Sequence, residues 1–266
     1  MKLSIEQETL YHYDSPVRSS TQYIRLTPRE SSRQRVHQWQ LDTPRGATQT
    51  HDGYGNVLHV LTLDKPVREI RIRAHGVVEI SPLIDQTGEA ETGNLSPLVF
   101  LRSTAITRPD DGLVVFAELF RRRAGALSGL RELAAAILEK MALSDAIGEV
   151  PMTAAQAFAA GTGCVRDQAH VFIACCRQLG IPARFVSGYV LLDDKGAPRI
   201  TGHAWTETWI GERWRSFDLA YGHAAGENHL NLAVGSDYLD ACPIRGVRTG
   251  GGVETMEANM KVHISK

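Results

Sequence analysis

Three residues far apart in the chain have the types and the order that nucleophilic attack on a carbonyl requires: Cys164, then His203, then Asp218. A thiol attacks once a neighbouring base takes its proton, and a third residue commonly orients that base. The order predicts that Cys164 attacks, His203 moves the proton and Asp218 holds the imidazole ring. A lone buried cysteine is more often a small packing residue, so this prediction depends on the elements that position the three side chains.

A helix is expected to begin at the cysteine. Apolar residues recur after it at three- and four-residue steps, which is the spacing of a buried helix face. They are Ala169, Phe172, Ile173, Cys176 and Leu179. Gly180 and Pro182 end this helix, and residues 183–192 are rich in β-branched and aromatic side chains, which predicts a strand. The start of a helix stabilises a thiolate because its N–H groups are unpaired, so this position favours Cys164 as a nucleophile.

A β-hairpin is expected to carry the histidine and the aspartate. Residues 203–210 and 213–219 are strand-like, and the Gly-Glu pair at 211–212 forms a two-residue turn between them. The expected pairs are Ile210 with Arg213, Trp209 with Trp214, Glu207 with Ser216, and Trp205 with Asp218. His203 and Asp218 then share one face as diagonal neighbours, roughly 7–8 Å apart at Cα, so the carboxylate can reach the imidazole.

Longer stretches around these residues are similar to a known family. They are Asp167–Tyr189, His203–Trp205, Phe217–Asp218 and, nearer the N-terminus, Tyr11–Tyr13, Ser15–Val17, Leu26–Arg29 and Asp52–Asn56. Through them nearly the whole chain resembles the bacterial transglutaminase-like proteins, which are related to the transglutaminase core and to papain-like cysteine proteases. The resemblance implies an α+β fold in which the helix bearing the cysteine packs on an antiparallel sheet, preceded by an N-terminal β-rich domain. It also implies hydrolysis of a peptide or amide bond more than crosslinking, with no metal and no cofactor.

One departure from the family pattern falls at the cysteine. The family usually has Gly-Val-Cys-x-Asp-x-Ala-His, whereas residues 163–170 read Gly-Cys-Val-Arg-Asp-Gln-Ala-His, so Val165 stands at the nucleophile position and Cys164 precedes it. One residue on a helix is a rotation of about 100° and a rise of about 1.5 Å, enough to turn the sulfur away from the base. A local adjustment of the first helical turn could restore its direction. Two hypotheses follow: an active cysteine acyl-transfer enzyme, or a catalytically inactive transglutaminase-like module that binds a peptide or a partner protein.

Other polar and aromatic residues near the proposed site have more ordinary explanations. His170 lies about 120° around the helix from Cys164, which favours packing or a hydrogen bond to the sheet over a role as base. The tryptophans on the His203 face are expected in the core rather than along a substrate groove. They are Trp205, Trp209 and Trp214. Glu207 could stabilise an imidazolium or pair with an arginine, and Asp218 is the better candidate to orient His203.

Composition limits the class of protein. The chain has 266 residues, of which 43% are hydrophobic and 22% charged, with a net charge of −1. This near-neutral balance argues against nucleic acid or a membrane as partner and leaves a peptide or protein amide as the expected substrate. Four cysteines without disulfide or zinc spacing predict free thiols and a reducing compartment. Because the N-terminus lacks a long apolar segment, a cytoplasmic location is expected; the oligomeric state stays open.

Two parts of the chain differ in pattern. Residues 1–97 contain alternating strands separated by turns, which predicts an N-terminal β-sandwich-like domain ending in a polar connection. Residues 98–266 are expected to form the transglutaminase-like core. Its further expected elements are helices at 128–141 and 153–160, a loop at 223–231 and a last strand at 253–264.

Overall fold

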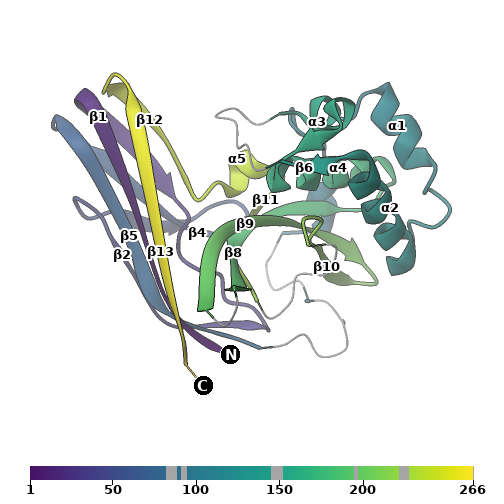
Figure 1. Cartoon of the computed structure of the whole chain (residues 1–266), viewed down its shortest axis with the longest axis horizontal. Coiled ribbons are helices and arrows are strands. Elements are labelled where there is room, and N and C mark those ends of the chain that lie inside the picture. Colours follow the sequence, from purple (N-terminus) through teal and green to yellow (C-terminus); the bar gives the residue numbers. More distant parts are fainter. Residues whose placement is uncertain (82–88, 91–94, 145–151, 195–196, 222–227, 266) are drawn as a thin grey trace.

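The computed structural model describes residues 1–265 except 82–88, 91–94, 145–151, 195–196 and 222–227. Figure 1 shows two β-sheets with helices gathered on the far side of the second sheet. The fold is α+β, as predicted. Within the described ranges, no helix is long and apolar enough to cross a membrane.

The first sheet is antiparallel and is built around one long strand. Five of its strands run in the order β2-β5-β1-β4-β3. Their bounds are β1 Lys2–Ile24, β2 Gln34–Asp42, β3 Thr48–His51, β4 Val57–Leu63 and β5 Val67–Ile80. Inward residues of β1 such as Leu3 and Ile5 are buried and alternate with more exposed ones, which is the period of a half-buried strand. β1 is irregular near its middle, where its register with β5 shifts between His12 and Val17.

The last two strands of the chain complete this first sheet. β12 (Ile244–Gly250) and β13 (Glu254–Ser265) both pair antiparallel with β1. Residues 98–266 were all expected in the core, whereas in the structure these two strands belong to the N-terminal sheet. The alternation of residues 253–264 correctly predicts the last strand, but it carries no information about the sheet that this strand joins, and β12 was not predicted as a strand.

The core contributes the second layer that the N-terminal sheet needs. Buried side chains of β1, β4 and β5 form one apolar cluster with residues of the core strands. The core members are Tyr189, Ile200, Leu230 and Leu232. The sandwich-like packing expected within residues 1–97 is therefore formed between the two sheets, since a sheet with one apolar face must bury it against another element.

The second sheet carries the candidate site. It is antiparallel, in the order β10-β9-β8-β11. Its bounds are β8 Ala183–Asp194, β9 Ala197–Ile210, β10 Arg213–Phe217 and β11 His229–Gly235. The loop expected at residues 223–231 is wrong for its last three residues, because β11 begins at His229 and is buried along its whole length.

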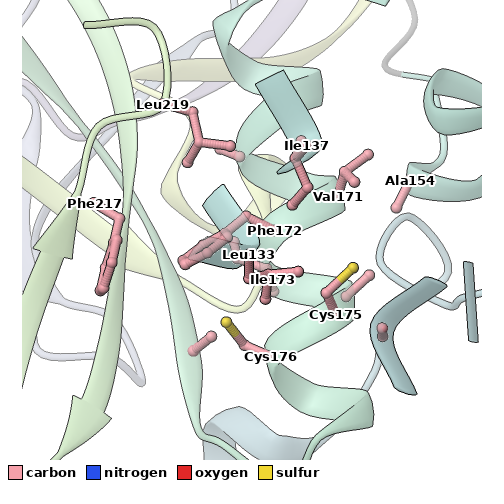
Figure 2. Packing of buried hydrophobic residues seen from close by; sticks show 14 of the residues in the cluster. Leu133, Ile137, Ala154, Val171, Phe172, Ile173, Cys175, Cys176, Phe217 and Leu219 are labelled. Carbon is pink, nitrogen blue, oxygen red and sulfur yellow. The ribbon is translucent and has the colours of Figure 1, made fainter. Parts of the chain in front are cut away.

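Helices cover the outer face of the second sheet. They are α1 Asp111–Glu118, α2 Leu127–Lys140, α3 Ala154–Ala160 and α4 Val165–Gln178, with short elements η2 Pro97–Leu101, β6 Ala142–Leu143, β7 Thr162–Gly163 and α5 Tyr238–Ala241. In α4 every residue from Arg166 to Arg177 is buried. Figure 2 shows Phe172 of α4 directed toward Phe217 of β10, and the two rings lie 4.9 Å apart. The prediction of a buried helix on an antiparallel sheet is confirmed.

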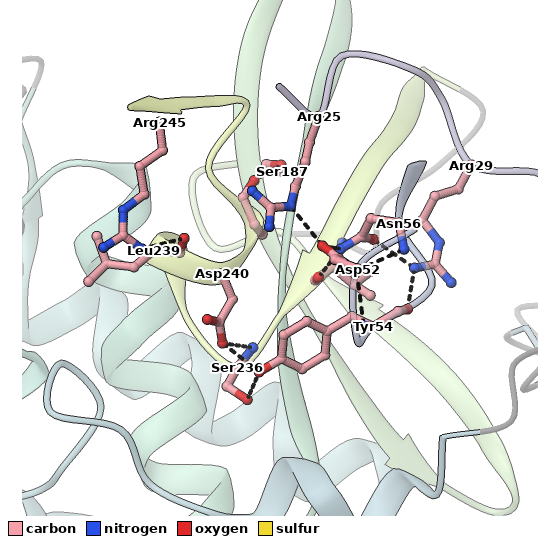
Figure 3. Close-up of polar contacts among 12 residues, drawn as sticks. Arg25, Arg29, Asp52, Tyr54, Asn56, Ser187, Ser236, Leu239, Asp240 and Arg245 are labelled. Atoms are coloured by element: carbon pink, nitrogen blue, oxygen red, sulfur yellow. Dashed lines mark hydrogen bonds and ion pairs between the residues drawn. The ribbon is translucent and has the colours of Figure 1, made fainter. Parts of the chain in front are cut away.

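The turn between β3 and β4 forms hydrogen bonds to the core next to β11. Figure 3 shows Tyr54 and Asn56 reaching across to it. The Tyr54 hydroxyl donates to Asp240 Oδ2 at 2.6 Å. The Asn56 amide donates to the Val234 carbonyl at 2.7 Å and accepts from its N–H at 2.8 Å. These bonds fix the position of the two layers relative to each other on the side where β11 lies.

Candidate active site

The hairpin of β9 and β10 forms in the predicted register. Gly211 and Glu212 have φ values of 60° and 57°, which are the left-handed conformations of a type I′ two-residue turn. Paired residues are Ile210 with Arg213, Trp209 with Trp214, and Glu207 with Ser216, as expected. The ladder ends at Phe217, and the same register places Asp218 beside Trp205 just beyond it.

This register brings His203 and Asp218 together. His203 Nε2 lies 2.8 Å from Asp218 Oδ2, and the side chains are 5% and 0% exposed. The other carboxylate oxygen, Oδ1, accepts from the Ala220 N–H at 3.1 Å. Burial alone would raise the pKa of Asp218, but hydrogen bonds from His203 and His229 outweigh it and hold the pKa at about 2. Asp218 is thus a carboxylate at neutral pH, and His203 is the donor in their hydrogen bond.

The bond to Asp218 decides which nitrogen of His203 is available for chemistry. Because His203 Nε2–H donates the hydrogen bond to Asp218, a neutral His203 imidazole has its free lone pair on Nδ1. The His203 ring stacks on Trp205, with centroids 6.1 Å apart, and also contacts Tyr221, with centroids 5.2 Å apart. These aromatic contacts hold the ring plane, so Nδ1 has a fixed direction from which it can accept a proton.

Trp205 fits beside His203 because of a glycine on the neighbouring strand. Gly188 of β8 pairs with His203 of β9. A Cβ at Gly188 would stand 2.1 Å from the Leu230 carbonyl oxygen and 2.6 Å from Trp205 Cη2, far closer than packing allows. Trp205 is 1% exposed, so the interpretation of it as a core residue is confirmed.

A second histidine, which the sequence analysis leaves in a loop, joins the pair. His229 is fully buried, and its Nε2 lies 2.7 Å from Asp218 Oδ2, the oxygen that His203 also contacts. The alternation of His229-Leu230-Asn231-Leu232 could have indicated a strand with the histidine on one face. Without the long-range placement of β11 beside Asp218, no pattern in the sequence connects His229 to the site.

His203, Asp218 and His229 are residue types that bind zinc or iron, and the three ligand atoms lie within 4.8 Å of one another. A metal about 2.0–2.1 Å from each atom would keep those atoms roughly 3.0–3.4 Å apart. The observed 2.8 and 2.7 Å separations from Asp218 Oδ2 are shorter and match charge-assisted hydrogen bonds. The geometry of this cluster fits a hydrogen-bonded network better than a metal site.

Cys164 occupies the start of α4, as predicted, but bonds to its own helix. It is the N-cap residue, and both its N–H (3.0 Å) and its Sγ (3.1 Å) donate to Asp167 Oδ2. Burial, and then the hydrogen bond to the Asp167 carboxylate, raise the pKa of the Cys164 thiol. Among the described residues, the thiol forms a hydrogen bond to Asp167 and none to His203. The depressed thiol pKa expected of a cysteine–histidine pair is therefore not a property of this conformation.

Val165, at the position where the family has its nucleophile, is only partly buried and packs against the apolar cluster of the core. This is the direction expected of an apolar residue in the first turn of a buried helix. The cysteine–valine exchange thus leaves valine on the packing side of α4 and the thiol at the cap.

The remaining residues near the site have structural roles. His170 Nε2 accepts from the Tyr238 N–H at 3.1 Å, and burial, then Arg166 and Arg177, lower its pKa to about 3, so it is a neutral packing residue as expected. Glu207 forms a 2.8 Å ion pair with Arg184, which confirms the second of its two proposed roles. All four cysteines are free and buried, as predicted.

Comparisons with known proteins agree with this architecture. The sequence pattern of the bacterial transglutaminase-like N-terminal region matches residues 3–79. The pattern of the transglutaminase-like superfamily matches residues 117–219, a range that contains Cys164, His203 and Asp218 but ends before His229.

Relatives resemble the chain over most of its length. An uncharacterized protein of Mycobacterium leprae is 25% identical over 275 residues, covering 98% of each chain. An uncharacterized protein of Mycobacterium bovis is 26% identical over 270 residues, covering 91% of this chain and 86% of its own. A crystal structure from Cytophaga hutchinsonii, of a protein provisionally described as a cysteine protease, covers 100% of this chain and 92% of its own, with a TM-score of 0.76 and 19% identity. At that identity the likeness establishes the fold.

Proposed function

The chain joins a bacterial transglutaminase-like N-terminal region to a core of the transglutaminase-like superfamily, and on this premise we propose that it is a cysteine-dependent acyl-transfer enzyme that hydrolyses a peptide or amide bond. Cys164 is the nucleophile, His203 the base and Asp218 the residue that orients the base. The observation that carries the proposal is the 2.8 Å bond between His203 Nε2 and Asp218, which leaves Nδ1 as the basic nitrogen.

The reaction requires two successive proton transfers, one to His203 and one from it. His203 Nδ1 takes the thiol proton as Cys164 Sγ bonds to the carbonyl carbon of the substrate, and the imidazolium then returns a proton to the departing amine. Water hydrolyses the resulting thioester, which releases the acid and restores the thiol. Asp218 stays ionised throughout, because its pKa of about 2 lies far below neutral pH.

In the described conformation the thiol is in a resting position. Its 3.1 Å bond to Asp167 has to open before Sγ can turn toward His203. Rotation about χ1 of Cys164 moves only its side chain, so the Cys164 carbonyl keeps the bonds that it accepts from the Asp167 and Gln168 N–H groups at 2.9 and 3.1 Å, and α4 does not have to unwind. A substrate that displaces Sγ from Asp167 would complete the site.

A second candidate function is a catalytically inactive module that binds a peptide or a partner protein. The exchange of cysteine and valine and the bond from the thiol to Asp167 favour it. In that case the His203–Asp218 pair is a structural remnant of the sheet and Cys164 is inert.

An activated acyl donor distinguishes the two candidates without knowledge of the natural substrate. With p-nitrophenyl acetate, the enzyme hypothesis predicts a burst of nitrophenolate and an acetyl group on Cys164, detected by mass spectrometry after acid quench. We expect His203→Gln to slow acetylation at least tenfold and Cys164→Ala to abolish it. Acetylation of Cys164 that is no faster than that of Cys242 and indifferent to His203→Gln would leave only the binding module.

A variant in which Cys164 and Val165 are exchanged gives a second test between the enzyme and the binding module. The double variant Cys164→Val, Val165→Cys restores the usual order of the family. If Cys164 is the nucleophile, this variant should lose acetylation. If the exchange has inactivated the protein, the variant should instead gain acetylation that depends on His203.

The partner we propose is a peptide or protein amide, with neither nucleic acid nor a membrane as a binding surface, because the net charge of −1 provides no basic excess. The cytoplasmic location stays a prediction from the sequence.

A further inference from the structure

His229 holds the carboxylate of Asp218 from the opposite edge of the sheet. Asp218 follows the end of β10, and His229 opens β11, and these two strands are the edges of the four-stranded sheet. The Asp218 carboxylate is held by His203 and His229 at Oδ2 and by the Ala220 N–H at Oδ1. The 2.7 Å bond from His229 is the shorter of the two histidine bonds that it receives.

The His229 ring is itself held in place. Its Nδ1 lies 2.8 Å from Asn228 Oδ1, and its backbone carbonyl accepts from Arg33 Nη2 at 3.3 Å. The Trp205 ring meets it edge-on, with centroids 5.1 Å apart. A ring fixed on these sides presents Nε2 at one position, so Asp218 Oδ2 has one favourable location.

His203 and His229 both donate to Asp218 Oδ2, so each receives only part of the electrostatic stabilisation that the carboxylate can give. A carboxylate that is fully available to a histidine favours the imidazolium form, which cannot accept a proton from a thiol. Here Oδ2 accepts from both His203 and His229, and Oδ1 accepts from Ala220. The ionisable groups that face the two rings are Asp218, Tyr221 and, behind His229, Arg33.

We propose that His229 is a positioning residue for the acyl-transfer site: through its hydrogen bond to Asp218 Oδ2 it fixes the carboxylate and keeps part of its charge from His203, so that His203 remains a neutral base with its lone pair on Nδ1. This inference rests on the proposed function, since it describes how that base is kept ready. His229 acts through Asp218 and touches no reacting atom.

Nitrogen-15 NMR of the imidazole rings tests the proposal directly. The full-length protein is used in a Cys164→Ala background, so the readout is independent of thiol reactivity, and a failure of the acyl-transfer proposal cannot be mistaken for a failure of this one. We expect His203 to be a single Nε2–H tautomer. His229→Leu, which removes the donor, should free the Asp218 carboxylate to shift and so mix the two tautomers of His203.

Matched variants separate positioning from simple packing. His229→Gln retains an N–H that can reach Oδ2 and should restore the single His203 tautomer of the unsubstituted protein. His170→Gln changes another fully buried histidine and should leave His203 unaffected. If His229→Leu does not fold, His229→Asn, whose amide is too short to reach Oδ2, makes the same test.

Two outcomes would overturn the proposal. One is a His203 tautomer that is the same with and without a donor at residue 229 in folded protein. The other is stoichiometric binding of Zn²⁺ that requires both histidines, measured by calorimetry with zinc chloride, because the cluster would then be a metal site.

Discussion

The two halves of the candidate site are held in different ways. On the sheet side, Asp218 receives hydrogen bonds from β9, from β11 and from the backbone that follows β10. On the helix side, the Cys164 thiol bonds to Asp167, three residues away in the same helical turn. The base is therefore fixed by contacts between distant parts of the chain, whereas the thiol is held by a local cap.

The difference indicates which half can move. Displacing Asp218 would break three bonds in a buried environment, and each partner would be left without an acceptor. Turning Cys164 away from Asp167 breaks one weak thiol bond, while the backbone N–H of Cys164 can keep its bond to Asp167. The fixed base and the movable thiol suggest that the site is completed from the helix side.

The largest effect on stability is expected from removing the Asp218 carboxylate on the sheet side of the site. Asp218→Ala should lower the free energy of unfolding by about 3 kcal/mol, because His203, His229 and the Ala220 N–H lose a charged acceptor in the interior. Urea denaturation at pH 7 measures it. The matched control is Asp64→Ala, which removes an exposed ion pair with Arg45 and should cost less than about 0.5 kcal/mol. Equal losses in the two variants would contradict the comparison.

The pH dependence of stability should show the same bonds. The pKa of Asp218 is about 2 in the folded protein, whereas an exposed aspartate titrates near about 3.9. A lowered folded-state pKa stabilises the protein above the unfolded value, and this stability is lost as the pH falls from about 4 to about 2. The stability difference between wild type and Asp218→Asn should shrink by about 2 kcal/mol between pH 7 and pH 2. A difference that stays constant from pH 7 to pH 2 would argue against an ionised, bonded Asp218.

A smaller effect is expected on the helix side, in reactivity. Asp167→Asn removes the carboxylate that, after burial, raises the pKa of the thiol, and it retains a side chain that can cap the helix. At pH 7 the thiolate fraction of Cys164 should rise, so alkylation by iodoacetamide should become roughly threefold to tenfold faster. Cys242 in the same sample is the internal control and should label at an unchanged rate. An unchanged rate at Cys164 would mean that Asp167 does not hold the thiol.

The smallest effect should come from removing the thiol itself. Cys164→Ala loses a weak sulfur donor but keeps the backbone bond to Asp167, so unfolding should become easier by less than about 1 kcal/mol. Cys176→Ala, in the fully buried core of α4, leaves a cavity and should cost more. The reverse order, measured by urea denaturation, would show that Cys164 is part of the rigid core.

Local chemistry made the hairpin half of the site predictable. Gly211-Glu212 requires a tight turn, and the turn fixes the register that brings His203 to Asp218. The buried helix α4 and its end were likewise visible in the spacing of apolar residues. Motifs of the family added the pairing of a β domain with a core, which spacing alone does not show.

Features that depend on distant contacts were not predictable. His229 joins the site only because β11 lies at the edge of the sheet beside β8, a placement that its own residues do not encode. The direction of the Cys164 thiol depends on χ1 at a cap position, where an aspartate three residues later competes with a histidine 39 positions away in sequence. The partner of the final strands was missed for the same reason.

The pairing of β13 with β1 affects the order in which the protein can be made. Lys2 pairs with Ser265 and Tyr13 with Glu254, so β1 is synthesised about 240 residues before the strand that covers this edge. Figure 1 shows the N-terminus and the end of β13 close together. Contacts of such long sequence separation form slowly. β1 pairs with β5 along one side, and until β13 is in place the N–H and C=O groups on its other side are unpaired. Such an exposed edge can pair with strands of other molecules. A newly made chain should therefore be most prone to aggregate just before residues 244–265 become available.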